Sequence, residues 1–378
     1  MDSSQKLTNT DVKKLNKNRI FRLIYNSDKI SRQEIADQLG LSLPTVNQNL
    51  KMLMEDGLIE YVGNFISTGG RRAQAITINN NARKAISVNI KADYINVDVV
   101  GLKGQIIYSM AVKAHFSKSS AYIEKLTDAV RHAVDYVGAD ADDIMGVGVT
   151  VPGILDDEKQ ILISAPPLKA KNYDFTRLIS AIDYPVVVMN DARAEAYAGH
   201  WFNGKPEDEK IYIMLGEGVG GAYINASAIR NGVHNRGGEF GHMVIHPGGK
   251  QCLCGKKGCF EAYVSEKVLS SELDMTLDNF FELAAQGNKN NSNVLDEYMD
   301  NLALGINNIY TMMDCDIVLG GTVAPYLKQY DNSIKERLVN DYSFDTDADY
   351  LRISDGGGRK SGLGAALSFV ARFIDGVE

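Results

Sequence analysis

Three of the four cysteines of this 378-residue chain fall within eight residues, at Cys252, Cys254 and Cys259. Thiolates this close together are typical zinc ligands, since a structural zinc takes four tetrahedral N or S ligands. His242 and His246 lie just upstream, and spacing alone leaves either as the fourth ligand. Free thiols in a surface loop are the alternative. Four protein ligands leave no open coordination position, so the predicted Zn²⁺ is structural and holds a loop in place.

A second stretch with chemical potential is GEGVGG, at residues 216–221. Glycine turns of this kind can cradle phosphate, because the backbone N–H groups can approach an anion closely. This turn connects two strand-like segments and no helix follows it, as a dinucleotide fingerprint would require. By itself it therefore identifies no ligand.

The composition and charge describe the chain that carries these motifs. No apolar run is long enough for a membrane span, and the N-terminus has no signal core, so we expect a cytoplasmic protein without membrane contact. The net charge is −8, but residues 1–75 hold 11 Lys/Arg against 8 Asp/Glu. A basic head on an acidic body is typical of a nucleic-acid-binding module joined to a second domain.

Residues 18–60 predict three helices. Ser31 followed by Glu34 is a capping-box pattern at the start of the second helix, and Gly40 is a plausible end. Ser42 then predicts the N-cap of the third helix. Two short helices joined by a tight turn form a helix-turn-helix, whose second helix enters the major groove of DNA.

The apolar stripe of the third helix consists of Val46, Leu50 and Leu53, and it determines which side chains face outward. The polar residues expected to reach base edges and phosphates are Ser42, Thr45, Gln48 and Asn49.

The segment after the third helix predicts a wing. Alternating apolar and polar residues flank STGGRR, which indicates a strand, a glycine-rich tip and a second strand. Arg71 and Arg72 at the tip are expected to enter a minor groove or to hold phosphates. The alternative is a helical bundle with a hairpin used for protein contacts. Capping, turn, polar face and basic wing together favour DNA binding.

From residue 85 onward, apolar strand-like segments alternate with amphipathic helices, and glycine turns follow several strands. This order predicts an α/β fold.

The motifs together resemble the signature of the ROK family of sugar kinases and sugar-responsive repressors. The resemblance is carried by Glu-x-Gly-His at 239–242 and by Cys-x-Cys-Gly-x-x-Gly-Cys-x-Glu at 252–261. VPGILD at 151–156, NDARAEA at 190–196 and IVLGGTVAP also match, and the likeness covers about residues 84–378. The N-terminal module with its GGRR wing resembles the DNA-binding half of the family's regulators.

The resemblance implies a winged helix-turn-helix followed by a two-lobed, actin-like ATPase fold with sugar in the cleft. The implied boundaries are 1–83 for the DNA-binding domain and 84–378 for the ROK domain. Within it, lobe one covers about 84–191 plus a C-terminal helix at 361–378, and lobe two covers about 192–360.

The resemblance also assigns residues. It selects His242 over His246 as the zinc ligand. The residues that match the family's sugar contacts are Asn190, Asp191, Glu239, His242 and Glu261. Carboxylates and an amide suit a ligand with several hydroxyls. Asp191 matches the general base of the kinases.

The chain departs from the kinases at both phosphate loops. Their first loop reads Asp-x-Gly-Gly-Thr, and Asn89–Asp93 here has lost the first carboxylate and both glycines. Asp93 replaces the threonine, and Glu217 replaces the threonine of the second loop. Two carboxylates facing a triphosphate oppose ATP binding, so we expect no enzyme activity.

The sequence therefore predicts a repressor that binds operator DNA as a homodimer, or a tetramer, and responds to a monosaccharide that it does not phosphorylate. Paired heads suit paired half-sites. The alternatives are a sugar kinase with a DNA-binding head and a repressor controlled by a protein partner.

Overall fold

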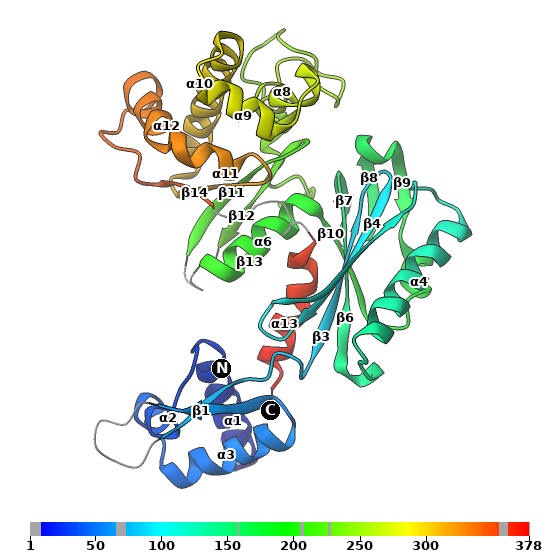
Figure 1. Cartoon of the computed structure of the whole chain (residues 1–378), viewed down its shortest axis with the longest axis vertical. Helices are drawn as coiled ribbons and strands as arrows, with labels where there is room; N and C mark the ends of the chain where they lie inside the picture. Colours follow the sequence, from blue (N-terminus) through cyan, green and yellow to red (C-terminus); the bar gives the residue numbers. More distant parts are fainter. Residues whose placement is uncertain are drawn as a thin grey trace, which may run out of the picture.

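The computed structural model describes residues 9–65, 73–156, 159–204, 208–225, 228–354 and 362–377. Figure 1 shows an elongated molecule with a small helical head at one end and two larger lobes beyond it. Arg71 and Arg72 lie outside the described residues. Within those residues, no helix combines the length and apolar character needed to cross a bilayer.

The head is a winged helix-turn-helix, as predicted. Its elements are α1 (Asn9–Tyr25), α2 (Arg32–Leu39), α3 (Leu43–Glu55), β1 (Ile59–Asn64) and β2 (Gln74–Ile78). The capping box of Ser31 and Glu34 is present at α2, which ends at Gly40 with φ +64°. Ser42 caps α3 by accepting from the Thr45 N–H. The antiparallel pair β1–β2 forms the wing.

The first lobe contains a five-stranded mixed sheet. Its strands, in spatial order, are β10 (Val186–Asn190), β6 (Ile144–Val151), β3 (Lys84–Ile90), β4 (Tyr94–Gly101) and β5 (Ile106–Lys113). Helix α4 (Ser120–Tyr136) covers one face, and α13 (Leu363–Asp375), the last helix of the chain, covers the other. A three-stranded antiparallel sheet extends this lobe. Its strands are β7 (Ile154–Asp156), β8 (Ile161–Ala165) and β9 (Ala170–Asp174), and the short helix α5 (Thr176–Ser180) follows them.

The second lobe is built on another five-stranded sheet. Its strands, in spatial order, are β13 (Ala228–Ile229), β12 (Val219–Asn225), β11 (Glu209–Leu215), β14 (Asp316–Gly320) and β15 (Leu351–Ile353). Helix α6 (Asp191–Asn203) packs on one face, and the remaining helices gather on the other (Figure 1). These are α7 (Glu261–Val264), α8 (Glu266–Leu269), α9 (Leu277–Ala285), α10 (Lys289–Met313), α11 (Ala324–Leu327) and α12 (Asp331–Arg337).

Helices α6 and α13 cross between the two lobes. At the crossing, a side chain on Gly364 would place its Cβ 1.9 Å from the Ala194 carbonyl oxygen, so only glycine permits this approach. The buried residues of the head join those of α13 in one apolar cluster. Phe21 of α1, for example, meets the Phe373 ring edge-on, with ring centroids 6.4 Å apart. The head is therefore packed against the body through the inter-lobe helices.

Candidate zinc and sugar site

The structure brings His242, Cys252, Cys254 and Cys259 together. Their ligand atoms all lie within 4.8 Å of one another. The Cys254 and Cys259 sulfurs are 3.7 Å apart, and the Cys252 sulfur is 3.9 Å from His242 Nδ1. Sulfurs bound tetrahedrally to one zinc at 2.3 Å are about 3.8 Å apart, so this cluster has the size of a Cys₃His zinc site.

The loop that carries the cysteines is shaped by short backbone pairings. Val244 pairs with Cys259, and Gln251 pairs with Lys257, as isolated antiparallel bridges. Gly258 has φ +82°, and a Cβ there would lie 1.7 Å from the His246 carbonyl oxygen. The backbone thus turns back tightly enough to bring sulfurs from both ends of the loop together.

Of the two histidines that spacing left open, only His242 reaches the cluster. The His246 Nε2 atom instead lies 2.6 Å from the Asn301 Oδ1 atom of α10. Burial raises the pKa of the Cys252 thiol to about 12, so this thiol carries a proton that a bound zinc would displace.

One predicted sugar contact, His242, belongs to the cluster, and a second, Glu239, lies beside it. His242 directs Nδ1 toward the sulfurs, while its Nε2 lies 3.8 Å from Glu239 Oε2. Burial raises the pKa of Glu239, an effect that His242 and then Arg193 oppose. A ligating histidine is usually oriented by a partner on its other ring nitrogen, and Glu239 lies where such a partner is needed.

Glu261 connects the cysteine loop to the glycine turn. Its Oε1 lies 3.7 Å from the Cys252 sulfur, and its Oε2 accepts the Val219 N–H at 2.9 Å. A Cβ on Gly218 would meet the same Oε2 at 2.8 Å, so the carboxylate lies directly on the turn. One N–H of this potential phosphate cradle is already occupied.

Asn190 and Asp191 lie at the start of α6. Asn190 is buried; its Oδ1 caps the helix by accepting the Arg193 N–H, and its Nδ2 donates to the Gly153 carbonyl at 2.8 Å. Both ends of this amide therefore position the helix. The Asp191 Oδ1 accepts the Ala192 N–H, and its Oδ2 lies 3.5 Å from the Lys91 ammonium.

Lys91 and Arg193 are site residues that the sequence reasoning missed. Lys91 stands where the kinase loop has its first glycine, and its charge faces the carboxylate that matches the kinase base. Arg193 is buried, and its guanidinium donates to the Asn235 carbonyl at 2.6 Å. The substituted glycine was the available signal for Lys91; the NDARAEA motif contained Arg193 without indicating a role.

The remaining phosphate-loop residues are arranged as follows. Asn89 is buried at the end of β3. Asp93 is exposed and lies 2.8 Å from the Nδ1 of His115. Glu217 is exposed at the tip of the β11–β12 turn. Asp93 and Glu217 therefore both present exposed carboxyl groups.

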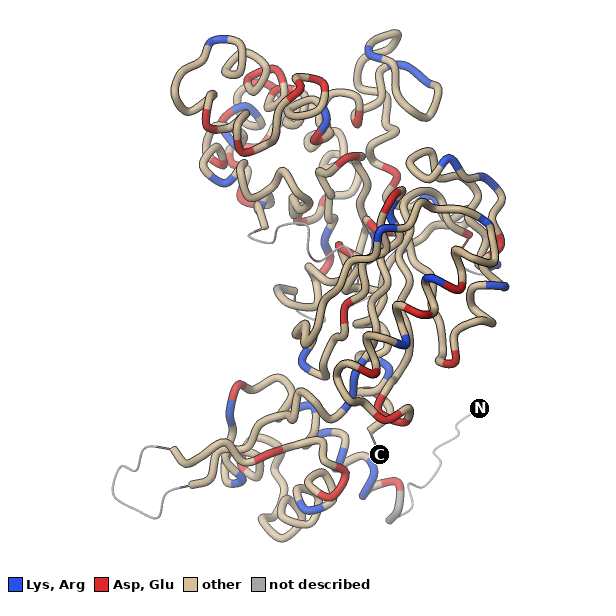
Figure 2. Tube along the Cα trace, turned by 45° about the vertical axis from the view of Figure 1, so that its right-hand side comes forward, with Lys and Arg blue, Asp and Glu red and all other residues tan. Residues whose placement is uncertain are grey.

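In the head, Ser42 and Gln48 are exposed and Thr45 is half-buried. Asn49 differs from expectation, because it is only 3% exposed and its amide donates to the Thr45 carbonyl at 2.8 Å. Positions 46, 49/50 and 53 share one face of a helix, so Asn49 belongs to the buried stripe. Figure 2 shows basic and acidic positions interspersed along the described head.

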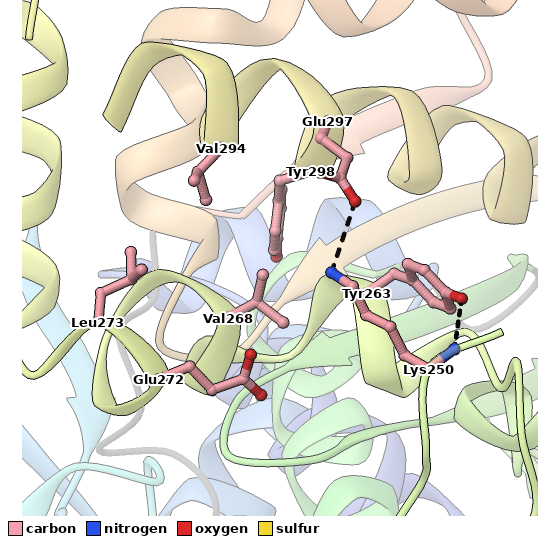
Figure 3. Close-up of a pocket in the computed structure, with 8 residues that line it drawn as sticks. All are labelled: Lys250, Tyr263, Val268, Glu272, Leu273, Val294, Glu297 and Tyr298. Atoms are coloured by element: carbon pink, nitrogen blue, oxygen red, sulfur yellow. Dashed lines mark hydrogen bonds and ion pairs between the residues drawn. The ribbon is translucent and has the colours of Figure 1, made fainter. Parts of the chain in front are cut away.

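Two cavities stand apart from the cysteine loop's ligand atoms. One, of about 120 Å³, lies under the loop in the second lobe (Figure 3). Lys250 crosses it to reach Glu297 at 3.4 Å, and its backbone N–H donates to the Tyr263 hydroxyl. The other, of about 310 Å³, lies between α6 and α13.

Comparison with known proteins agrees with this architecture. The ROK family model matches residues 85–370, which is more than half of the chain, so the chain belongs to the ROK family. A winged helix-turn-helix DNA-binding model matches residues 15–60.

The chain is similar to named regulators. It is 29% identical over 319 residues to the xylose repressor of Bacillus subtilis (strain 168), covering 82% of each protein. It is 26% identical over 264 residues to the DNA-binding transcriptional dual regulator NagC of Escherichia coli (strain K12), covering 69% of this chain and 65% of that protein.

Two solved structures place the fold. A ROK family transcriptional regulator, a homologue of the E. coli MLC protein, superposes with a TM-score of 0.75 at 20% identity, covering 97% of this chain and 98% of that chain. A ROK family glucokinase from Streptomyces griseus, solved with glucose and AMPPNP, gives a TM-score of 0.61 at 25% identity, covering 75% of this chain and 98% of that chain. The winged head and two-lobed body predicted from the sequence are thereby confirmed.

Proposed function

We propose that this protein is a sugar-responsive DNA-binding repressor that works as a homodimer in the cytoplasm and does not phosphorylate its effector. The observation that carries the proposal is the packing of a winged helix-turn-helix onto the inter-lobe helices of a ROK body. The names of the matched relatives, which include repressors for xylose and for N-acetylglucosamine, support the same class.

In the head, the exposed start of α3 would read the operator. Ser42, Thr45 and Gln48 would contact bases and phosphates of a major groove, and Arg71 and Arg72 of the wing would contact the minor groove or the backbone. Asn49 has no place in this set, because its amide is buried. A dimer would present two such heads to two half-sites.

In the body, Asp191, Glu239, His242 and Glu261 would bind the sugar hydroxyls, and Asn190 would hold Asp191 in position by capping α6. Zinc on His242, Cys252, Cys254 and Cys259 would be structural. It would fix the separation between His242 and Glu261, the two sugar contacts at either end of the cysteine loop.

Phosphoryl transfer needs a cradle for phosphate and a site for Mg²⁺. Exposed Asp93 and Glu217 would add negative charge where a triphosphate must bind, and Glu261 already uses the Val219 N–H of the turn. Lys91 lies 3.5 Å from the Asp191 carboxylate and would hold it in an ion pair, in the position where a kinase needs a general base for the sugar hydroxyl. These features favour a binding site over a kinase site.

Helix α6 supplies a route from the sugar to the DNA. It begins at Asp191 in the sugar site, and near its other end Trp201 contacts Tyr25, the last residue of α1 in the head. Sugar that closes the lobes around Asp191 would move α6 and with it the surface against which the head packs. Such a ligand changes operator affinity only if it binds one arrangement more tightly than the other.

The test is a calorimetric titration of the zinc-loaded protein with xylose, glucose, N-acetylglucosamine and their phosphates, paired with an operator mobility-shift assay. At least one sugar should bind and change operator affinity. A coupled ADP-release assay should stay at background with every sugar. Sugar-dependent ADP release would establish the kinase alternative, and a panel without any binder would favour control by a protein partner.

A further inference from the structure

The cavity of about 310 Å³ is lined by Met189 and Arg193, which flank the proposed sugar contacts Asn190 and Asp191 in the chain, and by Asp375, which pairs with Arg22 of the head. Its walls come from β10 and α6, from β13 and the segment after it, and from the C-terminal half of α13. The polar residues that line it are Arg193, Tyr197, Asn231, Ser368, Arg372 and Asp375. Its volume is at the lower end of the range for small-molecule sites, which are frequent between domains.

The lining contains two guanidinium groups and one carboxylate. The carboxylate, Asp375, is already engaged by the head, because Arg22 of α1 lies 2.5 Å from its Oδ1. Arg372 is exposed, and its guanidinium carbon lies 5.1 Å from the centroid of the Phe369 ring, a cation–π contact that favours this direction of the side chain. Asp375 is paired with Arg22, and Arg193 already donates to the Asn235 carbonyl and faces the nearby Glu239 carboxyl, so the excess of positive charge in the cavity rests on Arg372.

Polar groups beside the guanidiniums suit a hydroxylated ligand. The Ser368 hydroxyl donates to the Ala365 carbonyl at 2.7 Å, which leaves its oxygen able to accept. The Tyr197 hydroxyl also lines the cavity and, as a phenol, can donate and accept at neutral pH. Met189, Ile229 and Ala371 supply the apolar part of the wall.

We propose that this cavity binds a small organic anion of about monosaccharide size, a phosphate ester or a carboxylate, through Arg372, with Arg193 adding positive charge to the wall. A planar guanidinium can hold either group with two parallel hydrogen bonds. The occupant would lie against the end of α13, where Asn18 of the head donates to the Ile374 carbonyl at 2.7 Å. The proposal is independent of the neutral-sugar response.

The experiment uses the full zinc-loaded chain with Asp191→Ala, so that the sugar site contributes as little as possible. Calorimetric titrations with inorganic phosphate, glucose 6-phosphate and gluconate separate the phosphate source from the carboxylate source. We expect saturable binding of at least one probe. Adding Arg372→Gln should weaken it at least tenfold, and the control Arg352→Gln, at an exposed residue of β15 in the second lobe, should leave it unchanged.

A second variant protects the test against loss of fold. Ala371→Phe narrows the cavity without removing charge and should also abolish binding, while thermal unfolding verifies that each variant remains folded. The proposal is overturned if none of the three probes binds. It is also overturned if Arg372→Gln and Arg352→Gln weaken binding equally, which would indicate an adventitious charge effect. If glucose binding fails in the wild type but the anion binds here, only the proposed sugar response is lost.

Discussion

The indole of Trp201 meets the phenol ring of Tyr25 edge-on, with the ring centroids 6.2 Å apart and the planes at 77°. Trp201 belongs to α6, whose first residue is the proposed sugar contact Asp191, and Tyr25 is the last residue of α1 in the head. Ten residues of helix span about 15 Å, so one rigid element connects sugar site and head.

Trp201 is the only tryptophan of the chain, so its emission reports this contact directly. Addition of the effector sugar should shift or quench the emission over the same concentration range that changes operator affinity, because both follow α6. In Asp191→Ala both responses should disappear. A protein whose operator affinity responds to sugar while its emission spectrum stays constant would exclude α6 as the route.

Tyr25→Phe should weaken the junction between head and body. The Tyr25 hydroxyl donates to the Leu102 carbonyl at 3.0 Å, and losing such a bond typically costs about 1 kcal/mol in the free energy of unfolding. The sugar-induced change in operator affinity should shrink as well. Tyr136→Phe, at a residue that is 67% exposed, is the matched control and should alter neither denaturant unfolding nor the response.

Removal of zinc should abolish the sugar response before it unfolds the chain. Chelation, or Cys254→Ser, frees the loop that separates His242 from Glu261, while the apolar cores of both lobes remain. Metal analysis should give one zinc per chain, and sugar affinity measured by calorimetry should fall at least tenfold. Cys315→Ser, outside the cluster, should retain the metal and the response. Normal sugar binding by zinc-free protein would contradict the role given to the metal.

Lys91→Gly should not create a kinase. It restores one glycine of the kinase loop and removes the cation beside Asp191, but Asn89, Asp93 and Glu217 remain. ADP release should stay at background, and sugar affinity should change by less than the loss caused by Asp191→Ala. Measurable sugar-dependent turnover in this single variant would mean that Lys91 alone suppresses catalysis.

Substitutions in the head should distinguish residues that recognise the operator from residues that stabilise the fold. Gln48→Ala should change which operator sequences are preferred, and Arg71→Ala should weaken binding to all sequences and reduce its salt dependence. Asn49→Ala should instead lower stability by about 1 kcal/mol, because it removes a buried bond to Thr45. Parallel binding isotherms on an operator panel and thermal melts check this division. If Asn49→Ala left stability unchanged but altered operator sequence preference, Asn49 would belong with the residues that contact DNA bases.

Local signals in the sequence predicted the head well. The Ser31–Glu34 capping box and the Ser42 N-cap involve residues three apart, so their effect is visible in a short stretch. Asn49 was placed wrongly because the apolar stripe was read from apolar residues alone. Asn49 is polar but buried, and its amide bonds to the carbonyl of Thr45 in its own helix. Nothing in the sequence indicates that such a residue faces inward.

The contacts that connect the parts could not be predicted in the same way. Lys91 and Asp191 are 100 positions apart, and the pairing of Arg22 with Asp375 joins opposite ends of the chain. Neither pair has a motif, since their proximity depends on how the sheets bring distant segments together. The family resemblance supplied His242, because spacing could not separate it from His246.

The packing of the head against α13 also has a consequence for biosynthesis. The head precedes the body in the chain, so it leaves the ribosome before Phe373, Ile374 and Asp375 of α13, which contact α1. A head that emerges early can fold, but it has no complete docking surface until the whole body has been made. The arrangement that connects the head to the sugar site therefore forms only after α13 has been synthesised, and a chain that stops before α13 would lack it.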